Sequence, residues 1–150
     1  MLEVIKRIHL PIIPPTATAQ QKGVFVRGGR AHFYTKAKVR EAEATYATLL
    51  MAHRPETPTE GEIYLHVTFI FPYRKSEPKR VTRNGDIIPH LQRPDLDNLE
   101  KNLIDTMTRL GFWRDDSQIF AKYTRKLRGP SPAVDIIYTD TNDTITNLYA

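Results

Sequence analysis

Two carboxylates lie where a proline-containing loop is predicted to pass into a helix: Asp95 and Asp97, separated by Leu96. If the backbone there is extended, side chains i and i+2 project to the same side, and both carboxylates can reach one cation. Such oxygens suit Mg²⁺ or Mn²⁺, which can activate water and stabilise the leaving oxygen of a phosphodiester. A second acidic pair, Asp115 and Asp116, precedes a predicted strand. These acids indicate metal-dependent phosphodiester hydrolysis.

Lys101 lies four residues after Asp97, one turn further along the same face of the predicted helix. Its ammonium group can stabilise the negative charge that develops during phosphoryl transfer. A structural interpretation competes with this one. The carboxylates would then only cap the helix, Lys101 would pair with Asp97 or Asp105, and the later acidic pair would form a turn. The spacing alone leaves both interpretations open.

Positive charge is concentrated in two stretches of a chain whose formal net charge is +5. One is a long predicted loop, residues 72–94, and the other follows the second acidic pair and consists of Lys122, Arg125, Lys126 and Arg128. A predicted hairpin tip, in which Arg27 and Arg30 flank Gly28-Gly29, can also reach phosphates. Such density favours a polyanionic partner, although many charged runs are only solvated surfaces. The candidate DNA-binding residues are Arg27, Arg30, Arg74, Lys75, Lys79, Arg80, Arg83 and Arg93.

The length of 150 residues fits a single domain, which we expect to span residues 1–150 with a loose tail from about 140. The chain has no cysteine, so a metal would be held by oxygen or histidine. No apolar run reaches the length of a membrane span, and no signal-peptide pattern is present. We therefore expect a cytoplasmic protein with no membrane association.

Apolar periodicity predicts an α+β fold, a β-sheet with two main helices. Residues 63–71 alternate as in a central strand, and residues 96–110 carry the apolar stripe of a helix that ends at Gly111. Thr35 is predicted to cap an earlier helix that runs to about Ala52. The other predicted elements are strands at 2–10, 119–127 and 133–139, a hairpin with strands at 24–26 and 31–34, and a loop at 72–94 with a turn at Asn84-Gly85.

The remaining histidines and aromatic residues have structural roles by default. The five histidines lack metal-ligand spacing, so we assign them no catalysis and expect His66, on the central strand, to be packed or hydrogen-bonded. Phe112 and Trp113 stand next to the acids and close a helix. Such a pair is usually buried, although stacking on an unpaired base is the alternative.

The segments RPDLDNLEK, residues 93–101, and GFWRDDSQI, residues 111–119, resemble the RusA family of Holliday-junction resolvases, with Asp105 between them. The resemblance is looser over about 1–92 and 120–139. It implies a RusA-like mixed β-sheet and a homodimeric endodeoxyribonuclease that cuts opposing strands of four-way junctions symmetrically with Mg²⁺ or Mn²⁺. By resemblance, the catalytic and metal-binding acids are Asp95, Asp97 and Asp116, the essential lysine is Lys101, and Asp115 matches an accessory acidic position.

Other functions remain compatible with these residues. The long basic loop departs from the family pattern and bears on the choice of DNA structure more than on the chemistry. A nuclease that acts on flaps, forks or other branched DNA is therefore the first alternative. A non-catalytic DNA-binding protein is the second, but a pure binder gains nothing from acids that face phosphates.

Asp116 completes either the site of its own chain or that of a two-fold partner. The helix over residues 98–110 rises about 20 Å, which carries the chain away from Asp95 and Asp97. Residues 111–116 return at most about 20 Å when fully extended. Closure within one chain is therefore tight, and the sequence leaves both arrangements open.

Overall fold

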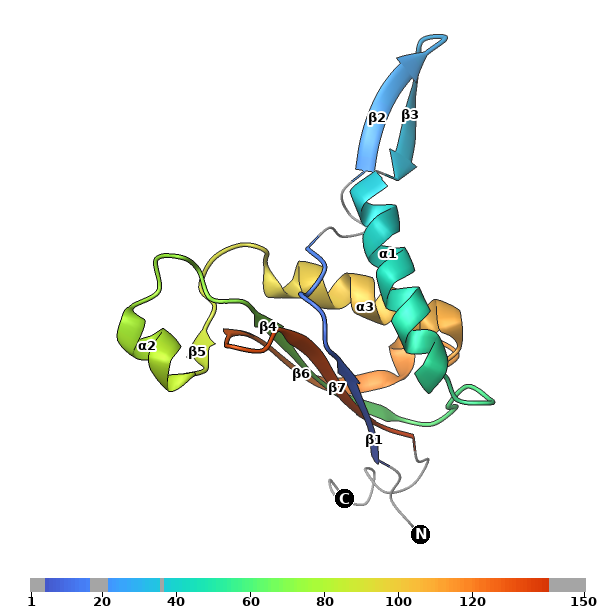
Figure 1. Cartoon of the computed structure of the whole chain (residues 1–150). Coiled ribbons are helices and arrows are strands. Elements are labelled where there is room, and N and C mark those ends of the chain that lie inside the picture. The colour runs from blue at the N-terminus through green and yellow to red at the C-terminus, as the bar shows by residue number, and fades with distance from the viewer. Residues whose placement is uncertain (1–4, 17–21, 36, 141–150) are drawn as a thin grey trace.

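The main sheet of the computed structural model, which describes residues 5–16, 22–35 and 37–140, is mixed and has five strands. They are β1 (Ile5–Leu10), β4 (Ile63–Phe71), β5 (Ile88–Pro89), β6 (Ile119–Arg128) and β7 (Ala133–Thr139). The strand order is β1-β7-β4-β6-β5, and the β4–β6 pair is parallel while the other pairs are antiparallel (Figure 1). The predicted α+β class is confirmed. Residues 141–150 of the predicted tail lie outside the described residues.

β4 is the central strand that the alternating pattern predicted. Leu65, Val67 and Phe69 have no exposed surface, whereas His66 and Ile70 on the other face are half-buried. Successive side chains of a strand point to opposite faces, so the helices cover only one of these two sets. The ring of His66 stacks on Tyr123 with centroids 5.0 Å apart, as expected for a packed histidine.

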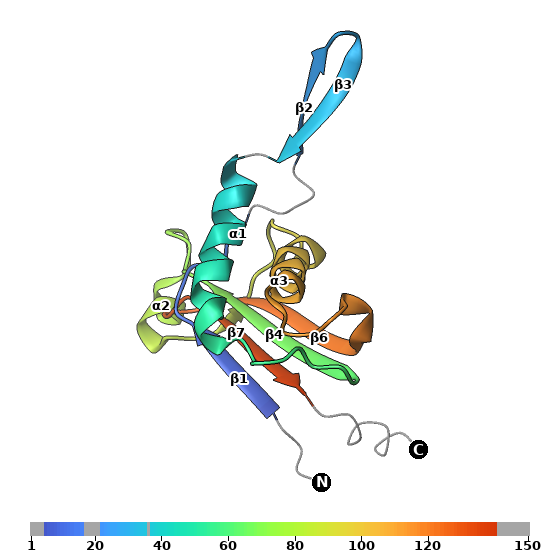
Figure 2. The same cartoon turned by 90° about the vertical axis from the view of Figure 1, so that its right-hand side faces the viewer.

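The two main helices, α1 (Ala37–Leu50) and α3 (Leu96–Leu110), lie against the same face of the sheet (Figure 2). The predicted stripe of α3 is buried at Leu99, Leu103 and Met107, and each such side chain contributes about 1.5–3 kcal/mol. Gly111 ends α3 with φ 85, a left-handed conformation that favours glycine. In the described part of the chain, no helix is long and apolar enough to cross a bilayer.

Phe112 and Trp113 belong to the core, as the default interpretation predicted. Neither has exposed surface, and both rings meet Tyr138 edge-on. The indole Nε1 of Trp113 donates to Thr108 Oγ1 at 2.7 Å, which satisfies the polar atom of the ring. This burial leaves no surface for stacking on a DNA base.

The prediction of a loop over residues 72–94 is wrong in part, because the structure has two short elements there. α2 (Lys79–Asn84) begins after Pro78 and ends at Gly85, whose φ of 67 supplies the left-handed C-cap. β5 then pairs with β6 at the edge of the sheet. The prolines suggested a loop, but a proline before the first turn is compatible with a helix.

The predicted hairpin forms a separate two-stranded sheet, β2 (Lys22–Arg27) with β3 (Arg30–Thr35), which projects beyond the first turn of α1 (Figures 1 and 2). Its turn is at Gly28-Gly29, as predicted. Thr35 is the last residue of β3 and not the helix cap that we predicted, because the strand is longer than its apolar core indicated. Helix η1 (Met51–His53) extends α1 by one 3₁₀ turn, close to the predicted end at Ala52.

Candidate functional site

Asp95 and Asp97 are both exposed at the beginning of α3. Asp95 occupies the N-cap position with an extended backbone, φ −67 and ψ 147, and Asp97 lies in the first helical turn. The side chain of Asp95 makes no capping hydrogen bond. Asp95 thus stands at the cap position, as the capping interpretation predicted, but its carboxylate does not cap α3 and is available to other ligands.

The segment before Asp95 is held by Lys126, on the side of β6 that faces the start of α3. The ammonium Nζ of Lys126 donates to the backbone carbonyls of Gln92 at 2.5 Å and Pro94 at 2.8 Å. Since Pro94 directly precedes Asp95, Lys126 sets the position at which the acidic pair begins. Sequence reasoning missed this role; its signal was the alternation of bases Lys122, Lys126 and Arg128 on one side of a predicted strand.

Glu100 was also missed as a site residue. It lies among the apolar side chains of α3 and is only 7% exposed, and its Oε1 accepts from Lys122 Nζ at 2.5 Å. Its other oxygen, Oε2, is buried and has no hydrogen-bond partner among the described residues. A buried carboxylate needs a paired charge, so Lys122 ties the middle of α3 to β6. This contact fixes the helix that carries Asp95 and Asp97.

His90 anchors the basic segment, residues 72–94, onto the sheet. His90 as a whole is 3% exposed; its ring packs edge-on against Phe71 with centroids 4.7 Å apart and accepts from the backbone N–H of Gln92 at Nδ1 (3.1 Å). Burial, together with the positive charge of Arg128, lowers the pKa of His90 to about 4. Arg128 in turn donates to the carbonyl of Pro72 at 2.9 Å. The two ends of the segment are thus held by the end of β6.

The structure separates the roles of Asp115 and Asp116. Asp115 caps the 3₁₀ helix η2 (Asp116–Gln118): its Oδ1 accepts from the N–H of Ser117 at 2.8 Å, and Gln118 Oε1 accepts from the N–H of Asp115 at 2.9 Å. Hydrogen bonds from Ser117 lower the pKa of the Asp115 carboxyl. The turn interpretation therefore accounts for Asp115, whereas Asp116 is exposed and borders a small pocket with Ile104 and Lys122.

The three predicted metal ligands are not gathered within one chain. Among the described residues, no group of three or more histidine, aspartate or glutamate side chains could hold a metal ion. Asp116 lines a small pocket with Ile104, a residue seven positions and thus about 10 Å beyond Asp97 along the helix. Asp95 and Asp97 both lie at the beginning of α3, whereas Asp116 lies in η2.

Lys101 pairs with Asp105, one of the two partners considered from the sequence. Its Nζ is 3.2 Å from Asp105 Oδ2, and both side chains are partly exposed. An exposed pair of this kind at i,i+4 is weak, about 0.3–0.5 kcal/mol. The ammonium can therefore leave Asp105 at little energetic cost.

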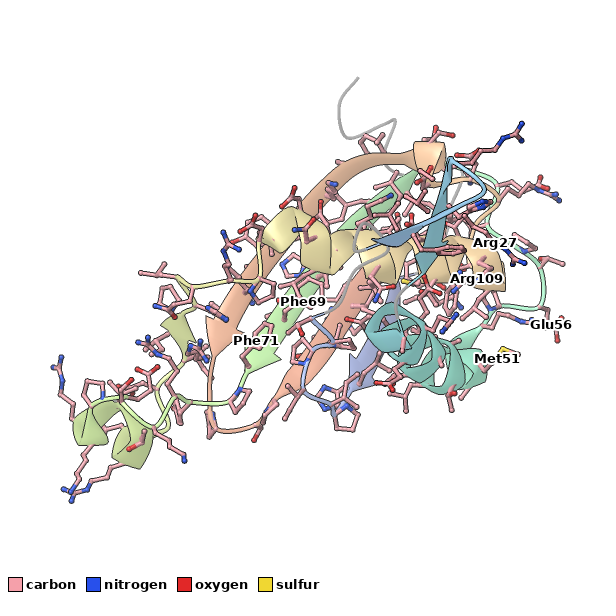
Figure 3. The ribbon with its side chains drawn as sticks, turned by 90° about the horizontal axis from the view of Figure 1, so that it is seen from above. Arg27, Met51, Glu56, Phe69, Phe71 and Arg109 are labelled. Atoms are coloured by element: carbon pink, nitrogen blue, oxygen red, sulfur yellow. The ribbon has the colours of Figure 1, made fainter. Side chains whose placement is uncertain are left out.

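The basic side chains occupy two separate regions. Arg27 and Arg30 are exposed at the tip of the β2–β3 hairpin, and Figure 3 labels Arg27. The second region surrounds α2, from which nitrogen-tipped side chains project away from the body in Figure 3. All its members are exposed, and Arg74 also pairs with Glu77 at 3.1 Å. This second region comprises Arg74, Lys75, Lys79, Arg80 and Arg83, whereas the exposed Arg93 lies two residues before Asp95, next to the start of α3.

Known proteins resemble this chain over most of its length. The profile of the family described as endodeoxyribonuclease RusA matches residues 13–138. The crossover junction endodeoxyribonuclease rusA of Lactococcus phage r1t is 33% identical over 125 residues, 82% of this chain and 88% of that protein. The YqaN protein of Bacillus subtilis (strain 168) is 27% identical over 127 residues, also 82% of this chain and 88% of that protein. Crossover junction endodeoxyribonuclease RusA of Escherichia coli (strain K12) is 50% identical over 32 residues, 21% of this chain and 27% of that protein.

Proposed function

Because the chain belongs to the RusA family of endodeoxyribonucleases, we propose that it resolves four-way DNA junctions by cutting two opposing strands symmetrically. The phage and Escherichia coli relatives are named for crossover junctions. One observation carries the proposal: two exposed carboxylates, Asp95 and Asp97, stand together at the N-terminus of α3. The positive end of a helix dipole lowers the cost of placing carboxylates and a DNA phosphate there.

Asp95 and Asp97 would hold Mg²⁺ or Mn²⁺. Mg²⁺ is usually bound through one or two carboxylates and keeps several waters, which suits an exposed pair whose first member makes no helix cap. When bound, such an ion activates water and stabilises the leaving oxygen. Lys126 orients the acids through the carbonyl of Pro94, and Lys101, released from Asp105, stabilises charge on the phosphate.

We also propose a homodimer in which Asp116 completes the site of the two-fold partner. Two observations support this arrangement over closure within one chain: no group of three candidate metal ligands forms among the described residues, and Asp116 lines a pocket with Ile104 and Lys122. Two shared sites related by a two-fold axis would face opposing strands of a junction, which is the geometry that symmetric cutting needs.

The first experiment incubates the full chain with labelled four-way junction, fork and linear duplex, each with Mg²⁺, with Mn²⁺ or with EDTA. We expect paired cuts in the junction with either ion and none with EDTA. Faster cleavage of the fork would favour the branched-DNA alternative. Binding without cleavage under every condition would support the non-catalytic alternative.

Asp97→Asn should abolish cleavage while junction affinity stays the same or rises, because the change removes both a metal ligand and a charge that repels phosphate. Cleavage gels and fluorescence anisotropy measure the two quantities separately. Parallel loss of binding and cleavage would mean that Asp97 has a structural role.

The shared site is tested by mixing inactive Asp97→Asn and Asp116→Asn subunits. A heterodimer with shared sites contains one intact site and one doubly altered site, so nicking of the junction should return. Mass spectrometry of differently tagged subunits verifies their exchange. If heterodimers form and no nicking appears, Asp116 serves its own chain.

A further inference from the structure

The β2–β3 hairpin is an arm that extends away from the rest of the molecule (Figures 1 and 2). Its six residue pairs run from Lys22–Thr35 to Arg27–Arg30, so each strand is about 20 Å long. Gly28 and Gly29, with φ 62 and 75, make a tight two-residue turn, and no described atom lies within 4 Å of where a Cβ would stand on either. No described part of the chain therefore covers the tip, and the tip can contact another molecule.

The arm exposes apolar side chains that its own fold does not bury. Val24 is 57% and Val26 74% exposed, and Phe25, stacked on His32 at 5.1 Å, is 48% exposed. A two-stranded ribbon by itself is only marginally stable in water. The arm thus gains stability from a partner that contacts its side chains.

The charge of the arm favours a nucleic acid as this partner over a second copy of the chain. Residues 22–35 contain Lys22, Arg27 and Arg30 and no acidic residue, and the whole chain carries +5. Two such arms would repel each other, whereas a polyanion would release counterions when the arm binds.

The shape of the arm selects the groove. The major groove of B-DNA, about 12 Å wide, admits a two-stranded β-ribbon without deformation of the duplex, whereas the minor groove, about 6 Å wide, admits one only where the DNA is bent or widened. Arg27 and Arg30 are opposite each other in the register, so both guanidinium groups enter first and can reach base edges. Val24 and Val26 lie behind the tip on the opposite face of the ribbon, where their apolar side chains can contact the other side of the groove, including thymine methyls.

We propose that the β2–β3 arm inserts into the major groove of one of the duplexes that make up the branched DNA. The inference rests on the proposed function in one respect: the bound duplex is taken to be part of the branched DNA substrate. The arm and α2 lie in different parts of the molecule in both views, so the two basic regions contact different stretches of duplex (Figures 1 and 2).

Methylation protection with dimethyl sulfate tests this, since it reports guanine N7 in the major groove and adenine N3 in the minor groove. With Asp97→Asn protein on a four-way junction, we expect protected guanine N7 atoms in one duplex arm. Adding Arg27→Gln and Arg30→Gln should remove that protection and weaken affinity about 10-fold or more, the value of one or two lost base contacts. The matched control, Arg54→Gln with Arg109→Gln, removes the same charge from exposed positions outside the arm and should keep the guanine protection.

A second variant tests the apolar contact without changing charge. Val24→Thr with Val26→Thr keeps β-branched side chains in the ribbon, so it should weaken junction affinity while the salt dependence stays unchanged. Guanine protection that survives the arginine changes, or protection confined to adenine N3, would overturn the proposal. The proposal would also be overturned if either arm variant dissociated a dimer in sedimentation velocity. The arm would then bind a second copy of the chain and not DNA. Wild-type protein that protects guanine N7 but never cuts the junction would contradict the proposed function and leave the arm proposal standing.

Discussion

Replacing Lys126 by methionine removes the ammonium group but keeps most of the aliphatic side chain. The carbonyls of Gln92 and Pro94 then lose donors at 2.5 and 2.8 Å. Hydrogen bonds to charged groups contribute about 1.5–3 kcal/mol each, and partial solvent exposure reduces this, so we expect a total loss of about 1–3 kcal/mol. For a chain of this size Tm should fall by about 2–10 °C.

The fall in cleavage rate should be larger than the loss of folding stability would explain. Asp95 follows Pro94 directly, and a displacement of about 1 Å in a reacting group can cost about 10²-fold in rate. The assay is single-turnover junction cleavage at saturating Mg²⁺, well below Tm, with urea denaturation to measure the free energy of unfolding.

Thr108→Val is the matched control, because it removes the acceptor of the buried Trp113 indole N–H in the last turn of α3, far from Asp95. It should lower the free energy of unfolding by about 1–3 kcal/mol, as Lys126→Met does, and leave the cleavage rate near that of the wild type. If Lys126→Met slows cleavage no more than Thr108→Val does, the idea that Lys126 positions the acidic pair is refuted.

Two further changes test the electrostatics. The pKa of His90 is lowered from 6.5 to about 4, so the unfolded chain binds more protons between these values, and stability present above pH 6.5 is lost as pH falls toward 4, by up to about 3 kcal/mol. His90→Gln should flatten this part of the pH dependence in urea denaturation, and an unchanged difference between pH 7 and pH 4.5 would contradict the burial of a neutral imidazole. Neutralising Lys79, Arg80 and Arg83 together should lower the salt slope of DNA binding by about 2–3 units. An unaltered slope in anisotropy titrations would place α2 off the DNA.

The elements predicted correctly from the sequence are those whose signal is local. The alternation over residues 63–71 and the stripe over residues 96–110 each record which side of one element is apolar, and the structure buries those sides in β4 and α3. Gly28-Gly29 and Gly111 mark a turn and a helix end because their positive φ values suit glycine. Asp95 and Asp97 could likewise be singled out, since their spacing is a property of adjacent residues.

Tertiary structure alone decided how distant segments meet. β5 exists because residues 88–89 pair with β6, and the parallel pairing of β4 with β6 joins residues more than fifty positions apart. Local periodicity carries no record of such partners, because the free energy of pairing depends on which surfaces pack together. For the same reason the sequence did not reveal that Lys126 holds Pro94, that Lys122 neutralises a buried Glu100, or that Asp116 lines a pocket with Ile104.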